Sequence, residues 1–315
     1  MNTGMGRSPQ WCCLLVCLLV EVLVSRLPAA EIFRVASYNL DNYLLAPSGT
    51  RAAKSPEGRA KIRESLRAAN ADIVALQEMG GTNALLELRD ALKAEGLDYP
   101  HWEHVRAYDT NIHVAVLSRF PLAARRPHTN DSFLLFGKRF QVKRGFAEVD
   151  IQVNPRYALT LLTAHLKSRL TSPEADETEL REQEARLLRE KIDAILAARP
   201  NANLIVLGDF NDTKDAKSTR TVLGQGKRAL IDTRPAERNG DDSPNPHAHY
   251  ASPQITWTHY YGKEDSYRRI DYILLSRGLA KEWLAEETYA LRLSNWGLGS
   301  DHRPIVAGFV AEESK

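Results

Sequence analysis

The sequence predicts an α/β domain, because two kinds of hydrophobic pattern alternate along one long segment. Short apolar runs rich in Val and Ile, bounded by Gly, Pro, Asn or Asp, recur from residue 32 to residue 310 and are typical of strands. Between some of them, apolar residues recur at three- and four-residue spacing, as in amphipathic helices. The 315 residues are 43% hydrophobic and 26% charged, with no repeat or long linker after residue 31. This mixture indicates one globular α/β domain.

Eight strands are expected from the apolar runs. In chain order they cover residues 32–38, 73–76, 112–117, 146–153, 158–164, 204–207, 270–275 and 305–310. Most are followed or preceded at once by polar residues, which marks the points where strands begin and end.

Three helices are expected between these strands, over residues 56–69, 82–95 and 174–198. Ser55 is the expected N-cap of the first helix, and Pro56 occupies its first position, where proline is favoured. Gly58 stands where a capping box would have Glu or Gln, so no capping box is predicted.

The first 30 residues differ from the rest of the chain. Arg7 lies in a short polar start, residues 11–24 are almost wholly apolar, and Pro28-Ala29-Ala30 supplies small residues. This order indicates a secretory signal peptide over residues 1–30, followed by a mature domain over residues 31–315. An uncleaved anchor and a mis-assigned start codon are the alternatives, although the run is shorter than the roughly 20 residues of a spanning helix.

Export predicts a periplasmic or extracellular location, and no later segment approaches spanning length, so no stable membrane insertion is expected after processing. The three cysteines, Cys12, Cys13 and Cys17, all lie in the leader. The expected mature chain therefore has no disulfide, no thiolate metal site and no cysteine nucleophile.

The charge gives no evidence of broad affinity for nucleic acid. The formal net charge is +2, and loss of the leader leaves +1, whereas binding by counterion release needs several clustered cations. Four basic pairs are interpreted as solvated surface: Arg125-Arg126, Lys138-Arg139, Lys143-Arg144 and Arg268-Arg269. Residues 239–253 read as an irregular loop, in which His247 and His249 are a weak candidate for metal binding.

Polar side chains gather at the ends of the expected strands, where α/β folds place their sites. Each alone is explained by turn or cap chemistry, but together they supply oxygen ligands for a hard cation and nitrogens for acid–base work. Oxygen donors without cysteine favour Mg²⁺, with Mn²⁺ or Ca²⁺ as alternatives. The candidates are Asn39, Asp41, Glu78, His165, Asp209, Asn211, Asp271, Asp301, His302 and, more weakly, Arg144.

Five motifs carry a resemblance to a known family. The segments YNLDN, LQEM, GDFND, RRIDYILLS and SDHRPI resemble, in order and spacing, those of the endonuclease/exonuclease/phosphatase superfamily, which includes deoxyribonuclease I-like enzymes. The resemblance spans residues 32–310. It implies a four-layered α/β sandwich, in which two mixed β-sheets pack face to face with helices outside.

The resemblance also implies a metal site and a water-activating group. Glu78 matches the main metal ligand, Asp301 lies close by, and Asn39 and Asp41 complete or support the site. Asp209 matches the residue that orients or deprotonates the attacking water. Whether Asp209 or a histidine is the base stays open at this stage.

The remaining roles concern the phosphate. By the same resemblance, Asn211 donates a hydrogen bond to a phosphoryl oxygen, and His302 contacts the phosphate with Asp271 holding its ring. His165 matches the deoxyribonuclease I and sphingomyelinase branches and would protonate the leaving alkoxide. Arg144 is a further candidate for phosphate binding.

The fold does not decide the substrate. The PAWCDR motif of inositol phosphatases is absent, and His165 together with export argues against abasic-site repair. What remains is an exported nuclease or other phosphodiesterase. Its expected substrate is a phosphate ester, and nucleic acid is one candidate. A phosphomonoesterase, a sphingomyelinase-like enzyme and a non-catalytic binding relative are the alternatives, and no protein partner is predicted. Trp257, Tyr260 and Tyr261 either stack on a base or pack in the core.

Overall fold

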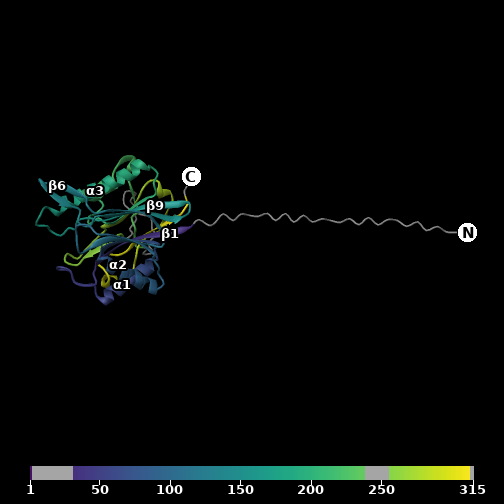
Figure 1. Ribbon diagram of the computed structural model, residues 1–315, viewed down its shortest axis with the longest axis horizontal. Helices are drawn as coiled ribbons and strands as arrows, with labels where there is room; N and C mark the ends of the chain where they lie inside the picture. The colour runs from purple at the N-terminus through teal and green to yellow at the C-terminus, as the bar shows by residue number, and fades with distance from the viewer. Residues whose placement is uncertain (2–30, 238–254, 313–315) are drawn as a thin grey trace, which may run out of the picture.

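Two six-stranded sheets lie face to face at the centre of the protein, with helices on both outer sides (Figure 1). The computed structural model describes residue 1 and residues 31–237 and 255–312. The expected leader and the pair His247 and His249 lie outside these described residues. The four-layered α/β sandwich with mixed sheets is confirmed.

The first sheet has the strand order β15-β16-β1-β2-β4-β3, in which β1 and β2 are parallel and the other neighbours antiparallel. Its strands are β1 (Ile32–Tyr43), β2 (Ile73–Met79), β3 (His101–Val105), β4 (His113–Ser118), β15 (Trp283–Ala290) and β16 (Ile305–Val310).

The second sheet has the order β11-β14-β10-β9-β8-β5, with β9 and β10 parallel. Its strands are β5 (Leu122–His128), β8 (Phe146–Asn154), β9 (Tyr157–His165), β10 (Leu204–Asp209), β11 (Ile231–Asp232) and β14 (Asp271–Leu275). Two separate hairpins complete the strands: β6 (Ser132–Leu135) with β7 (Lys138–Gln141), and β12 (His259–Tyr261) with β13 (Ser266–Arg268).

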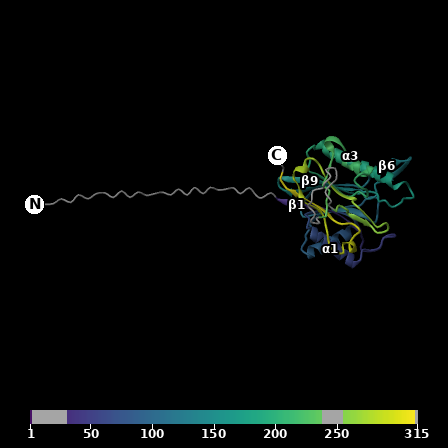
Figure 2. The same cartoon turned by 180° about the vertical axis from the view of Figure 1, so that it is seen from behind.

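Three apolar layers hold the sandwich together. Helices α1 (Pro56–Ala69) and α2 (Thr82–Ala94) cover the first sheet, and α3 (Glu177–Ala198) and α4 (Lys217–Leu223) cover the second. Both views show α1 and α3 on opposite sides of the sandwich (Figures 1 and 2). The central layer lies between the sheets, where Phe33 stacks on Phe309 with ring centroids 5.4 Å apart. No helix among the described residues is long and apolar enough to cross a membrane.

The expected strands and helices are all present, with small differences at their ends. Ser55 caps α1 as predicted, since its side chain accepts a hydrogen bond from the backbone N–H of Gly58 at 3.0 Å. Helix α3 begins at Glu177 rather than at residue 174, because the Asp176 carboxylate caps the amides of Thr178 and Glu179.

Sequence patterns miss the outer strands β3, β5, β11 and β15, both hairpins and the short helix α4. Strand β5 (LAARRPH) explains why: its residues alternate between half-buried and exposed, so it contains no apolar run. A strand at a sheet edge needs only one covered face, and charged residues on the other face protect the edge from pairing with other chains.

Strand pairing brings the ends of distant segments to one end of the sandwich. Asp209, the last residue of β10, is paired with His165 at the end of β9 and with Asp271 at the start of antiparallel β14. In the facing sheet, Asn39 of β1 is paired with Gln77 of β2, next to Glu78. The sequence motifs therefore meet where the two sheets face each other.

Gly208 is required for this arrangement. Its φ is +134°, and a Cβ placed there would lie 2.0 Å from the carbonyl oxygen of Ala164 on β9. Only glycine adopts this conformation without strain and lets the two backbones approach so closely. The glycine of GDFND thus sets the course of the chain into Asp209.

We predict that Gly208→Ala lowers the free energy of unfolding by about 2 kcal/mol or more, because it adds both a steric clash and a disfavoured φ. Urea denaturation monitored by circular dichroism measures this. Gly297→Ala is the matched control: its Cβ meets nothing within 4 Å, so a change within about 0.5 kcal/mol is expected. Equal stabilities of the two variants would contradict the interpretation.

Candidate active site

Asp209 lies at the centre of the candidate site and is only 1% exposed. Its Oδ1 accepts a hydrogen bond from the backbone N–H of Asn211 at 2.8 Å. Its Oδ2 accepts from the side-chain amide of Asn39, across the sheet interface, at 2.9 Å and from that of Asn211 at 3.3 Å. The Nε2 atoms of His165 and His302 lie 3.5 and 3.8 Å from the same oxygen. Burial raises the pKa of Asp209 to about 7, although His302 opposes the shift.

His302 is held by two buried neighbours. Its Nδ1 lies 2.8 Å from the Asp271 carboxylate, and its backbone N–H donates to Ser300 Oγ at 3.0 Å. Ser300 in turn donates to the backbone carbonyl of Asn39 at 2.7 Å. Burial lowers the pKa of His302, but the carboxylates of Asp271 and Asp209 outweigh it and raise that pKa well above its usual value. The imidazolium form is therefore favoured, with Nε2 facing Asp209.

Glu78 lies on the opposite wall, directly after the buried part of β2. Its φ of +55° turns the side chain out of the strand. Glu78 Oε2 accepts from the backbone N–H of Asn42 at 3.1 Å, and Oε1 lies 3.5 Å from the Asn39 amide and 3.8 Å from His165 Nε2. Burial raises the pKa of Glu78, with Asp301 and Asp41 adding to the rise and Arg144 opposing it. Such crowding of carboxylates is relieved by a bound cation.

The predicted metal ligands are not equivalent in the structure. Asp301 lines the pocket. Burial raises its pKa, but the hydrogen bond to His259 and the charges of His302 and His259 together outweigh burial and lower that pKa. Asp41 instead pairs with Lys54 at 3.2 Å and accepts a hydrogen bond from the side chain of Asn42 at 3.0 Å. Its position therefore suits a supporting role better than direct ligation. Asn39 presents its amide hydrogens to Asp209 and Glu78, while its oxygen accepts from the Asp41 backbone N–H.

Two of the predicted site residues, Arg144 and His165, have buried nitrogen atoms without hydrogen-bond partners among the described residues. In Arg144, which is 6% exposed, Nε and Nη1 make no hydrogen bond, and Nε lies 3.6 Å from the Asp109 carboxylate. In His165, Nδ1 makes none. Burial and the charge of Arg144 lower the pKa of His165 well below its usual value, so its resting imidazole is neutral. Unpaired buried donors on Arg144 are suited to an anionic ligand.

Asn211 differs from its expected role in one respect. Its Nδ2 donates to the Leu166 carbonyl at 3.0 Å as well as to Asp209. Both amide hydrogens are thus engaged within the protein, and donation to a phosphoryl oxygen requires that one of them be released. The arrangement shown here makes Asn211 a residue that orients Asp209.

His259 was not among the residues expected from sequence. Its Nε2 lies 3.3 Å from Asp301 Oδ2, and its ring centroid is 4.5 Å from that of His302. A β-bridge between the backbones of His259 and His302 brings them together from segments 43 positions apart. Nothing in the local sequence WTHYY distinguishes this histidine, because only the tertiary pairing places it in the site.

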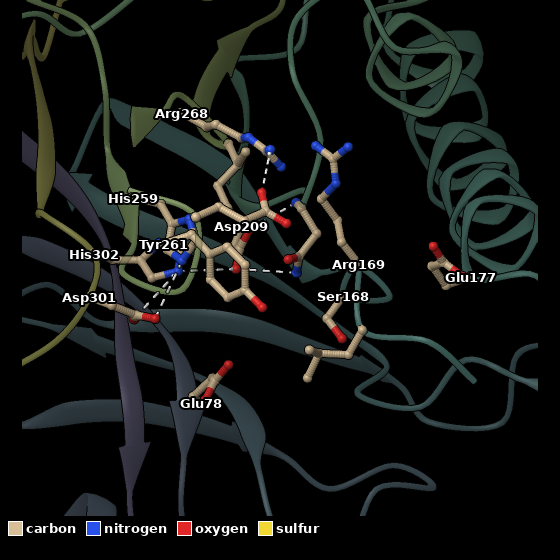
Figure 3. Close-up of a pocket in the computed structure, with 14 residues that line it drawn as sticks. Glu78, Ser168, Arg169, Glu177, Asp209, His259, Tyr261, Arg268, Asp301 and His302 are labelled. Atoms are coloured by element: carbon tan, nitrogen blue, oxygen red, sulfur yellow. Dashed lines mark hydrogen bonds and ion pairs between the residues drawn. The ribbon is translucent and has the colours of Figure 1, made fainter. Parts of the chain in front are cut away.

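These groups line a cavity of about 410 Å³, seen in Figure 3. The buried residues Asp209, His302 and Asn211 form its floor, and Glu78 and Asp301 lie to one side of Asp209 and His302 (Figure 3). Around them the lining residues are Ser168, Arg169, Leu170, Glu177, His259, Tyr261, Glu264, Arg268 and Ile270. Of the three aromatic residues singled out from sequence, Tyr261 lines this cavity, whereas Trp257 packs under the Arg303 guanidinium and Tyr260 against Tyr267.

A comparison with protein families matches residues 36–302 to the Endonuclease/Exonuclease/phosphatase family. The chain belongs to this family. Its members are phosphoester hydrolases and generally depend on divalent metal ions. No curated protein sequence matches significantly.

Solved structures share the fold at low sequence identity. The human Nocturnin catalytic domain with bound sulfate is 18% identical, covers 89% of this chain and 95% of its own, and has a TM-score of 0.61. Truncated Caenorhabditis elegans TDP2 is 19% identical, with coverages of 89% and 98% and a TM-score of 0.59. Sphingomyelinase C from Streptomyces griseocarneus is 18% identical, covers 89% of this chain and 99% of its own, and has a TM-score of 0.57. These likenesses concern the fold alone.

We predict that Asp271→Asn lowers the pKa of His302, because the largest favourable charge beside the imidazolium is removed while a hydrogen-bond acceptor is kept. Titration of the imidazole ¹⁵N signals by NMR in metal-free protein measures the change. Asp232→Asn, which removes a carboxylate paired with Arg269 instead, should leave His302 unaffected. An unchanged His302 titration in Asp271→Asn would show that Asp271 does not set its charge.

Proposed function

We propose that the protein is an exported, divalent-metal-dependent phosphodiesterase whose substrate is nucleic acid. The observation that carries the proposal is the pairing of Asp209 and His302 on the floor of the cavity. A carboxylate with a raised pKa lies 3.8 Å from an imidazole whose protonated form is favoured, and each is held by buried partners. Such a pair combines a base for water with a cationic donor for phosphate.

The residues present fit a divalent metal. Glu78 and Asp301 would hold it, because both line the cavity with carboxylate oxygens and the charge of Asp301 raises the pKa of Glu78. An oxygen donor set suits Mg²⁺, Mn²⁺ or Ca²⁺. When bound, the cation supplies charge that polarises the phosphoryl oxygens and offsets the leaving oxyanion.

Asp209 takes a proton from the attacking water. Its raised pKa makes it a stronger base than an ordinary carboxylate. Asn39 and Asn211 bind both of its oxygens, so the carboxylate cannot rotate freely. Orientation of this kind reduces the entropic cost of the step.

Two cationic groups stabilise the phosphate. His302 Nε2 donates to a phosphoryl oxygen as negative charge develops, and Asp271 keeps the ring in place. Arg144 supplies guanidinium donors that make no hydrogen bond with any described residue. His165 is neutral at rest, so it serves as a proton donor only after the negative charge of bound substrate raises its pKa.

The rim of the cavity supports nucleic acid as the substrate. Tyr261 offers a ring on which a base can stack, and Arg169, whose nearest carboxylate is 3.9 Å away on Asp212, can bind a neighbouring phosphate. A sphingomyelinase-like or phosphomonoesterase activity is the alternative that the first assay tests.

We predict metal-dependent cleavage of plasmid DNA and of bis-p-nitrophenyl phosphate by protein beginning at Glu31, abolished by EDTA. Asp209→Asn should lower kcat at least about a hundredfold with the fold intact, because the base is lost. Asp215→Asn, an exposed carboxylate close in sequence, is the control with near-normal activity. Hydrolysis of p-nitrophenyl phosphate or sphingomyelin alone would contradict the nuclease proposal.

Export rests on the pattern of residues 1–30 alone. Expressed in a secreting bacterial host, the full chain should yield a processed protein that starts close to Glu31, as N-terminal sequencing of the extracytoplasmic fraction would show. Retention of the intact N-terminus in the cytoplasm would refute this part of the proposal.

A further inference from the structure

Three of the four basic pairs in the sequence have carboxylate partners. Arg125 pairs with Glu103, and Arg126 pairs with Glu148 and Asp150. Arg268 pairs with Glu264, and Arg269 pairs with Asp232. Lys143 pairs with Glu174, and Arg144 pairs with Asp109. Lys138 and Arg139 are different, because neither forms an ion pair with any described residue. Arg139 donates to the hydroxyl of Ser132, and both residues are exposed.

These two cations lie on the β6–β7 hairpin, which projects from the edge of the sandwich (Figures 1 and 2). They line a second cavity of about 460 Å³, here called the basic cavity, together with Lys143 and Tyr108. Tyr108 is 62% exposed. The one carboxylate in the lining, Glu174, is 3.9 Å from Lys143, so positive charge dominates.

Two segments of the chain that line the basic cavity lead directly to residues of the active site. Lys143 lines it, and the next residue, Arg144, lies close enough to the catalytic side chains to lower the pKa of both Glu78 and His165. One loop serves both cavities as well: Ser168 to Leu170 line the catalytic cavity, and Pro173 and Glu174 line the basic one.

A buried carboxylate fixes this spacing. Glu184 of α3, which is 2% exposed, accepts the backbone N–H of Lys143 at 3.4 Å and that of Lys167 at 2.6 Å. The segment that follows β7 and the loop that borders the active site are thus bound to the same side chain of α3.

We propose that the basic cavity is a subsite for a polynucleotide strand, in which Lys138, Arg139 and Lys143 bind phosphates flanking the cleaved one. Tyr108 stacks on a base of the same strand. The inference rests on the proposed phosphodiesterase function. A polynucleotide strand has a phosphate and a base at every nucleotide, so it can contact the cations and Tyr108 of the basic cavity while one phosphate lies in the catalytic cavity. An ester with a single phosphate needs the catalytic cavity alone.

The test measures binding apart from cleavage. A fluorescent single-stranded oligonucleotide is titrated by anisotropy in the inactive Asp209→Asn background, with Lys138→Ala/Arg139→Ala added. We expect about a tenfold rise in Kd at low salt. The slope of log K against log salt should fall by about 1.4, since each lost phosphate contact to a single strand contributes about 0.7.

Arg277→Ala/Lys281→Ala is the matched control, because it removes the same two charges beyond the far end of β14, opposite to Asp271. It should leave Kd and the slope unchanged. Tyr108→Ala should raise Kd severalfold without altering the slope. In the active background, the Lys138/Arg139 double variant should raise KM for the oligonucleotide but leave kcat/KM for bis-p-nitrophenyl phosphate unchanged.

Equal effects of the two double variants would show a general charge effect and overturn the proposal. Failure of the Asp209→Asn protein to bind the oligonucleotide at low salt would overturn it too. Binding that depends on Lys138 and Arg139, but without any hydrolysis by the wild-type protein, would support the subsite and reject the proposed function instead.

Discussion

The burial of one carboxylate between two sheets is the constraint on which the rest of the site depends. Asp209 is removed from water, so its charge must be compensated by fixed donors, and these come from both halves of the sandwich: Asn39 from β1 and Asn211 from the turn after β10. His302 joins them from the segment before β16, held by Asp271. The packing of the sheets therefore affects the chemistry of the site directly, because a shift of one sheet against the other would remove the Asn39 donor from Asp209.

Much of the fold was predictable because its central strands are buried on both faces and read as apolar runs. Edge strands such as β5 and β15 were not, since an element that is covered on one face leaves no comparable run in the sequence. The site residues were predictable where they belong to motifs that end central strands, as Glu78 and Asp209 do. His259 escaped prediction, because its role arises from a β-bridge to His302 that no local spacing encodes. Likewise, no motif shows that Asp41 is paired with Lys54.

The charged residues also separate into two kinds that composition cannot distinguish. Most basic pairs are matched with carboxylates and help to hold strands and loops in place, as Arg269 does with Asp232. Others have no carboxylate partner among the described residues, as is the case for Lys138 and Arg139, and the Arg144 guanidinium keeps buried donors that make no hydrogen bond. A nearly neutral chain therefore carries locally uncompensated positive charge, and the net charge alone is a poor guide to anion binding.

The hydrogen bonds of Glu184 mark the boundary between the active-site segments and a peripheral hairpin. Glu184 accepts a hydrogen bond from Lys167, which precedes the loop that lines the active site. It accepts a second one from Lys143, which follows the β6–β7 hairpin. The hairpin pairs chiefly with itself, so its length and composition can change without disturbing Asp209. Substrate preference in such a scaffold can evolve by exchange of a peripheral element while the catalytic machinery is inherited intact.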